Sequence, residues 1–132
     1  MAVYSNFEDL PVWKEAKDLA VQIYKITKEG KLKRDYGLSD QIRKAAISIS
    51  SNIAEGFDRS SRREFIRSLY IAKGSVSEVR SQLLICKELG YLDRDVSEKL
   101  LEKTNFLTKQ IGAFISFLKK RNLEKKEDFQ NA

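Results

Sequence analysis

The sequence predicts an all-α fold: an up-and-down, left-handed four-helix bundle in which residues 1–132 form a single domain. The chain contains one proline and six glycines, so few residues interrupt a helix. Apolar residues recur at alternating spacings of three and four in four separate segments, the period of helices that pack lengthwise. The segments are joined by short stretches, and helices joined by short loops pack antiparallel to their neighbours.

The first two helices are predicted over residues 11–29 and 39–55. The first begins at Pro11, because the first helical turn does not need the N–H that proline lacks. Its apolar face carries Val12, Ala16, Leu19, Ile23 and Ile26. We expect Ser39 to cap the second helix and Gly56 to end it. The apolar face of this second helix carries Ile42, Ala45, Ala46, Ile49 and Ile53.

The last two helices are predicted over residues 61–89 and 95–121. Ser61 and Glu64 have the spacing of a capping box. In this motif the serine hydroxyl accepts from the backbone N–H of the glutamate, and the glutamate carboxylate accepts from the backbone N–H of the serine. Asp95 is the expected cap of the last helix. The core face of the third helix carries Phe65, Leu69, Ala72, Val76, Val79, Leu83 and Cys86. The core face of the fourth carries Leu100, Thr104, Leu107, Ile111, Phe114 and Leu118.

The helices offer more small and apolar surface than one bundle core uses. Small residues recur on the side of the third helix that faces away from its core stripe, and the fourth helix has a second aromatic stripe. These residues are Gly74, Ser77, Ser81, Phe106 and Phe117. We interpret them as the interface of a homo-oligomer, because small residues let another helix approach closely. The alternative is broad packing inside a monomer, with Gly74 tolerated in its helix.

The charge balance favours a polyanionic partner. Lysine and arginine number 25 against 19 acidic residues, a net charge of +6. The cations fall in three clusters: Lys28, Lys31, Lys33 and Arg34; Arg59, Arg62, Arg63 and Arg67; and Lys119, Lys120, Arg121, Lys125 and Lys126. The predicted nucleic-acid-binding residues are Arg59, Arg62, Arg63, Arg67, Tyr70, Lys31, Lys33 and Arg34, with Tyr70 stacking on a base.

Two alternatives remain for these cations. The arginines could pair with carboxylates across a subunit contact, and the C-terminal lysines could complement the dipole of the last helix. The second cluster lies near a helix N-terminus, where the dipole disfavours cations, and this placement favours an anionic partner there. We expect the polar tail, residues 122–132, to be flexible.

The sequence argues against an enzyme and against a bound cofactor or metal. Histidine is absent, which excludes Ser–His and Cys–His nucleophile systems and His-ligated zinc. The single cysteine, Cys86, lies on a core face, and no glycine-rich phosphate loop is present. No catalytic residue is therefore assigned. The sequence shows neither a long apolar run nor a signal peptide, so we expect a cytoplasmic protein with no membrane partner.

Several motifs resemble one family in their order along the chain. They are Asp9-Leu10 with Val12-Trp13-Lys14, Tyr36-Gly37-Leu38, Gln41-Ile42-Arg43-Lys44-Ala45-Ala46, Asn52-Ile53-Ala54-Glu55-Gly56, and Gly74-Ser75 before Glu78. The chain resembles the four-helix-bundle proteins encoded in intervening sequences of bacterial 23S rRNA genes, over roughly residues 7–118. Ser50 departs from the pattern, since many relatives carry proline there.

The resemblance implies a bundle that assembles as a ring, often a homopentamer, with no enzymatic activity attached to the family. It also implies similarity to the accessory proteins of diversity-generating retroelements, basic pentameric bundles that bind nucleic acid and a reverse transcriptase. The combined hypothesis is a non-enzymatic, homo-oligomeric bundle that binds RNA or DNA through its basic clusters. The alternative is a protein-interaction scaffold that docks an acidic protein partner and binds no nucleic acid.

Overall fold

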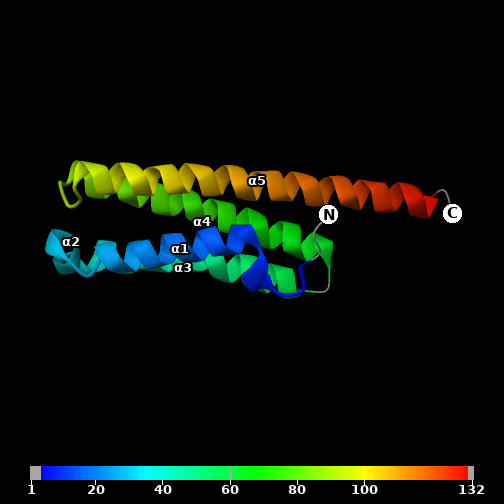
Figure 1. Cartoon of the computed structure of the whole chain (residues 1–132), viewed down its shortest axis with the longest axis horizontal. Helices are drawn as coiled ribbons and strands as arrows, with labels where there is room; N and C mark the ends of the chain where they lie inside the picture. The colour runs from blue at the N-terminus through cyan, green and yellow to red at the C-terminus, as the bar shows by residue number, and fades with distance from the viewer. Residues whose placement is uncertain (1–3, 60, 131–132) are drawn as a thin grey trace.

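The computed structural model describes residues 4–59 and 61–130, with side chains over 4–59 and 61–121. These residues form a short 3-10 helix and five α-helices: η1 (Phe7–Asp9), α1 (Pro11–Ile26), α2 (Gly30–Arg34), α3 (Tyr36–Asp58), α4 (Arg62–Glu88) and α5 (Arg94–Gln130). No strand occurs in this part of the chain, which confirms the all-α prediction. The four long helices run alternately up and down along one axis (Figure 1).

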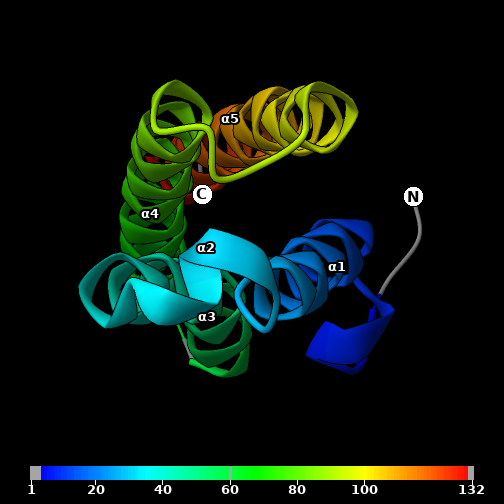
Figure 2. The same cartoon turned by 90° about the vertical axis from the view of Figure 1, so that its left-hand side faces the viewer.

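An end-on view shows how the four long helices surround one centre (Figure 2). The helix pairs α1 and α3, α3 and α4, and α4 and α5 all pack along their lengths, and α5 returns to α1 to close the circle. The chain therefore places each long helix beside its sequence neighbour. Within the described residues, no helix is both long enough and apolar enough to cross a bilayer.

The chain between α1 and α3 differs from the prediction. α1 ends at Ile26 rather than residue 29, because Thr27 Oγ1 donates to the carbonyls of Ile23 at 2.9 Å and Tyr24 at 3.0 Å. Gly30 then adopts a φ of 63° and opens α2, a helix in the stretch predicted as a connector. A five-residue helix is too short to form on propensity alone. It is held by Leu32, whose side chain is fully buried.

Both predicted ends of the second long helix, residues 39 and 55, are wrong. α3 begins at Tyr36, because the carboxylate of Asp35 accepts from the Leu38 N–H at 3.1 Å and so caps the helix. Ser39, the predicted cap, is buried and donates to the Leu32 carbonyl at 2.5 Å. α3 also continues past Gly56 to Asp58, because Gly56 is buried where α3 crosses α4.

The caps of α4 follow the sequence more closely. Ser61 Oγ accepts from the Glu64 N–H at 3.1 Å, which is the serine half of the predicted capping box. Gly90, with a φ of 70°, completes a Schellman motif after α4. In this motif the Tyr91 N–H donates to Cys86 and the Gly90 N–H donates to Lys87.

The final helix extends at both ends beyond the predicted bounds. α5 begins at Arg94, since the Ser97 N–H donates to the Asp93 carbonyl at 2.9 Å. Asp95 therefore lies in the first turn and is not the cap. At its other end α5 runs to Gln130 rather than 121, and the flexibility of residues 122–132 stays a prediction. Residues 131 and 132 lie outside the described part of the chain.

The core follows the predicted helix faces except in α1 and α5. In α1, Ile26 is only partly buried, and Ala20 is buried in addition to the predicted residues. All seven residues predicted on the core face of α4 are buried. In α5, Phe114 is only partly buried, and Ile115 enters the core in addition at 4% exposure. Phe114 instead packs edge-on against Phe65, with ring centroids 5.3 Å apart. The buried Thr104 is satisfied because its hydroxyl donates to the Leu101 carbonyl at 2.6 Å.

Candidate nucleic-acid interface

The predicted nucleic-acid-binding residues lie at two opposite ends of the bundle (Figure 1). The first turns of α4 and the loop before them carry what we call the arginine face: Arg59, Arg62, Arg63, Arg67 and Tyr70. α2 and the residues before it carry what we call the α2 cluster: Lys28, Lys31, Lys33 and Arg34. A helix of the 27 residues of α4 is about 40 Å long, so the two groups are separate sites.

The structure extends the arginine face with a residue from α5. The Lys119 ammonium lies 4.8 Å from the centroid of the Tyr70 ring and donates to the Tyr70 hydroxyl. Arg63 and Arg67 are exposed one turn apart on the same helix, and Tyr70 is 47% exposed. Lys119 belongs to a basic cluster about fifty residues away in sequence. Two clusters that the sequence separates therefore meet at one end of the bundle.

The C-terminal cluster is only partly described. Arg121 lies over the Phe117 ring, with its guanidinium carbon 5.6 Å from the centroid. Both residues lie two positions from Lys119, which contacts Tyr70, so they belong to the same end of the bundle. The side chains of Lys125 and Lys126 lie outside the described residues.

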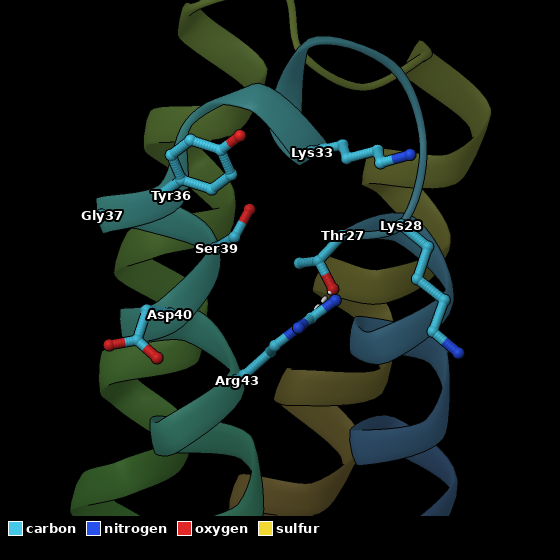
Figure 3. A pocket seen from close by; sticks show the side chains of 8 residues that line it. All are labelled: Thr27, Lys28, Lys33, Tyr36, Gly37, Ser39, Asp40 and Arg43. Carbon is cyan, nitrogen blue, oxygen red and sulfur yellow. Dashed lines mark hydrogen bonds between the residues drawn. The ribbon is translucent and has the colours of Figure 1, made fainter.

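At the opposite end, a pocket of about 810 Å³ opens between the end of α1 and the start of α3 (Figure 3). Its lining residues are Thr27, Lys28, Lys33, Tyr36, Gly37, Ser39, Asp40 and Arg43. A second hollow of about 560 Å³ shares Tyr36 and Gly37 and is also lined by Lys31, Arg34, Asp35 and Tyr91. Tyr36 stands between the two hollows and is 82% exposed.

Sequence reasoning did not assign Tyr36 or Arg43 to a binding site. Tyr36 lies two residues after Arg34, the last cation of the α2 cluster, and could have been found as an aromatic residue near a basic stretch. Arg43 gave no such signal, because a pair of cations such as Arg43-Lys44 on a helix is usually solvated. Arg43 lines the same pocket as Lys28 and Lys33 because α3 packs antiparallel against α1, a contact that local sequence does not reveal.

The charges at both ends are not neutralised by described carboxylates. Over side chains 4–59 and 61–121, the salt bridges join Lys44 to Asp40 at 3.0 Å, Arg94 to Glu98 at 3.0 Å, and Lys103 to Asp18. None of these pairs includes a cation of the arginine face or of the α2 cluster. Each end therefore presents a group of cations to solvent, as a polyanion site requires.

Two titratable groups, Cys86 and Tyr91, have pKa values above their ordinary ones. Burial, with a smaller contribution from the Asp35 charge, raises the pKa of the Cys86 thiol to about 11. At neutral pH this thiol is protonated and is not a nucleophile. The Tyr91 hydroxyl donates to Asp35 at 3.1 Å, and this bond raises the pKa of Tyr91.

Among the described residues, no three His, Cys, Asp or Glu side chains gather as metal ligands would.

The residues predicted as the oligomer interface are all exposed on the single chain. Gly74, Ser77 and Ser81 lie on α4, and a Cβ added at Gly74 would meet no atom within 4 Å. On α5, Phe106 is 55% exposed and Phe117 is 41% exposed. Their burial between subunits stays a prediction.

Comparison with known proteins supplies a family. The family model described as 23S rRNA-intervening sequence protein matches residues 8–113. Among solved structures, the chain is similar to a protein of unknown function from the S23 ribosomal protein family of Bacteroides thetaiotaomicron. The TM-score is 0.72 and the identity 26%, with 79% of this chain and 97% of that chain covered. No curated protein matches the sequence. The family match includes the α2 cluster and the arginine face, whereas Lys119 lies beyond it.

Proposed function

The chain belongs to the 23S rRNA-intervening sequence protein family, and we propose that it is a non-enzymatic helical bundle that forms a homo-oligomer and binds RNA or DNA. Binding occurs through phosphate contacts of the cationic ends, with Tyr70 as a stacking surface. The name of the similar structure, which refers to a ribosomal protein family, is compatible with an RNA partner.

One observation carries the nucleic-acid part of this proposal: the meeting of Tyr70, Lys119 and the α4 arginines at one end of the bundle. Arg63 and Arg67 provide fixed forks that suit phosphate oxygens, and the exposed ring of Tyr70 suits an unpaired base. Lys119 covers part of that ring in the free chain. A base that stacks on Tyr70 displaces the ammonium, which is then free to contact a phosphate.

Salt dependence is the first test of this function. Each cation that neutralises a phosphate releases a condensed counterion, with a log–log slope of about −0.7 per contact on single strands. We expect mixed-sequence RNA and DNA to bind with little sequence preference and to dissociate between about 50 and 200 mM salt. Fluorescence anisotropy measures this directly. Absence of binding to every nucleic acid at low salt would favour an acidic protein partner instead.

Assembly is tested at Gly74, where another helix can approach closely. Gly74→Leu fills this space, and we expect it to weaken the oligomer while leaving the helix content unchanged. Gly74→Ala is the matched control, since one methyl group obstructs the approach far less. Native mass spectrometry gives the oligomeric state and circular dichroism gives the helix content. A monomeric unmodified protein at micromolar concentration would contradict the proposed assembly.

A further inference from the structure

We propose that the pocket between α1 and α3 binds the phosphomonoester of a nucleotide, with the phosphate at Arg43 and the base against Tyr36 (Figure 3). This inference rests on the proposed function, because it names the part of a nucleic acid that the α2 end recognises. It concerns the end of the bundle away from the arginine face, so the two sites can be tested separately.

Arg43 has the features of an anion receptor. Its Nε donates to Thr27 Oγ1 at 2.7 Å, and its guanidinium carbon lies 4.8 Å from the centroid of the Tyr24 ring. These two contacts fix the guanidinium in place. Its terminal nitrogens make no hydrogen bond or ion pair with any residue in the described part of the chain. Fixed terminal N–H groups can hold two oxygens of one phosphate.

The rest of the lining provides the matching charge. Lys28 and Lys33 line the same pocket as Arg43, so three cations surround one space. The single carboxylate of the lining, Asp40, is paired with Lys44 at 3.0 Å. A phosphomonoester carries close to two negative charges at neutral pH, more than a phosphodiester within a strand. The excess of cations therefore favours a terminal phosphate.

Tyr36 supplies the surface for a base. Its ring is 82% exposed, and the pocket of about 810 Å³ lies in the size range of small-molecule sites. The backbone beneath Tyr36 is held by Asp35, whose carboxylate accepts from both the Leu38 N–H and the Tyr91 hydroxyl at 3.1 Å. An exposed ring on a fixed backbone can stack on a base at little entropic cost.

The experiment compares ligands that differ only in the phosphate. The probes are AMP, adenosine, and a ten-nucleotide single-stranded RNA with either a 5′-phosphate or a 5′-hydroxyl. We expect AMP to bind and adenosine not to, and the 5′-phosphate to tighten RNA binding about tenfold. Arg43→Gln should abolish this preference, whereas Lys109→Gln, an equal charge change at an exposed site on α5, should keep it.

A second pair of variants tests the stacking surface without affecting the fold. Tyr36→Leu should weaken binding of AMP and of the 5′-phosphorylated RNA about fivefold or more, and Tyr36→Phe should retain it. The Tyr36 side chain is so exposed that its substitution leaves the core packing intact. These two variants therefore still test whether the pocket binds the nucleotide if Arg43→Gln does not fold.

The outcomes separate the pocket from the proposed function. AMP binding that depends on Arg43, without binding to any RNA or DNA, supports the pocket with a free nucleotide as its ligand and contradicts the proposed function. RNA binding with no 5′-phosphate preference and no AMP binding overturns the pocket and leaves the arginine face as the binding site. A preference that survives both Arg43→Gln and Tyr36→Leu also overturns it.

Discussion

Gly56→Ala is expected to lower the free energy of unfolding by about 1–3 kcal/mol, although alanine favours helix more than glycine does. A Cβ at this position would lie 2.6 Å from Ser68 Cβ and 3.0 Å from Phe65 Cδ1. Atoms cannot approach this closely, so α3 and α4 would have to move apart where they cross. Urea unfolding followed by circular dichroism, at one fixed protein concentration, measures the change.

Gly112→Ala is the matched control for this effect. Its added Cβ would meet only Lys73 Nζ at 3.8 Å, an ordinary contact. We therefore expect the gain in helix propensity to dominate, with stabilisation of up to about 1 kcal/mol. If the two substitutions changed stability by the same amount in the same direction, the tight crossing at Gly56 would be disproved.

Gly56 also shows what the sequence could not decide about the fold. Glycine after an apolar segment is typical of a helix end, and Gly90 has this role after α4, where its backbone adopts positive φ. At Gly56 the same residue lies within a helix and lets α4 approach. The choice between these two uses depends on the neighbouring helix, which lies elsewhere in the sequence. The core face of α4 depends only on local periodicity and was predicted correctly.

The candidate site also contains features that local sequence predicts and features that it does not. The arginines of α4 were identified from their own segment, because charge and helical spacing are local properties. The contact of Lys119 with Tyr70 depends on the antiparallel register of α4 and α5, and the position of Arg43 depends on the contact of α3 with α1. Sequence reasoning therefore identified cations but not the groups that they form.

The triple substitution Arg59→Ala, Arg63→Ala and Arg67→Ala is expected to weaken binding of single-stranded RNA about a hundredfold at 0.1 M salt. Three lost phosphate contacts, each worth a slope of about −0.7, account for this factor and reduce the salt slope by about 2. Anisotropy titrations at several salt concentrations measure both quantities.

Tyr70→Ala should weaken single-stranded binding more than duplex binding, because only unpaired bases expose a face for stacking.

The control removes the same charge elsewhere. Lys14→Ala, Lys87→Ala and Lys109→Ala lie at exposed positions on α1, α4 and α5, and together they lower the net charge by the same three units. If the arginine face binds nucleic acid, this control should weaken binding far less than the arginine variant does. Equal losses in the two triple variants would mean that overall charge, and not this face, determines affinity.

Native mass spectrometry of the arginine variant separates binding from assembly. If the three arginines contact phosphates, the variant keeps the oligomeric state of the unmodified protein and loses only affinity. If they instead pair with Glu55 or Glu88 of a neighbouring subunit, the substitution dissociates the oligomer, and weaker binding follows from lost multivalency. An intact oligomer with unchanged affinity would exclude both roles, and the lysines at the C-terminal end of α5 would then be the next cations to substitute.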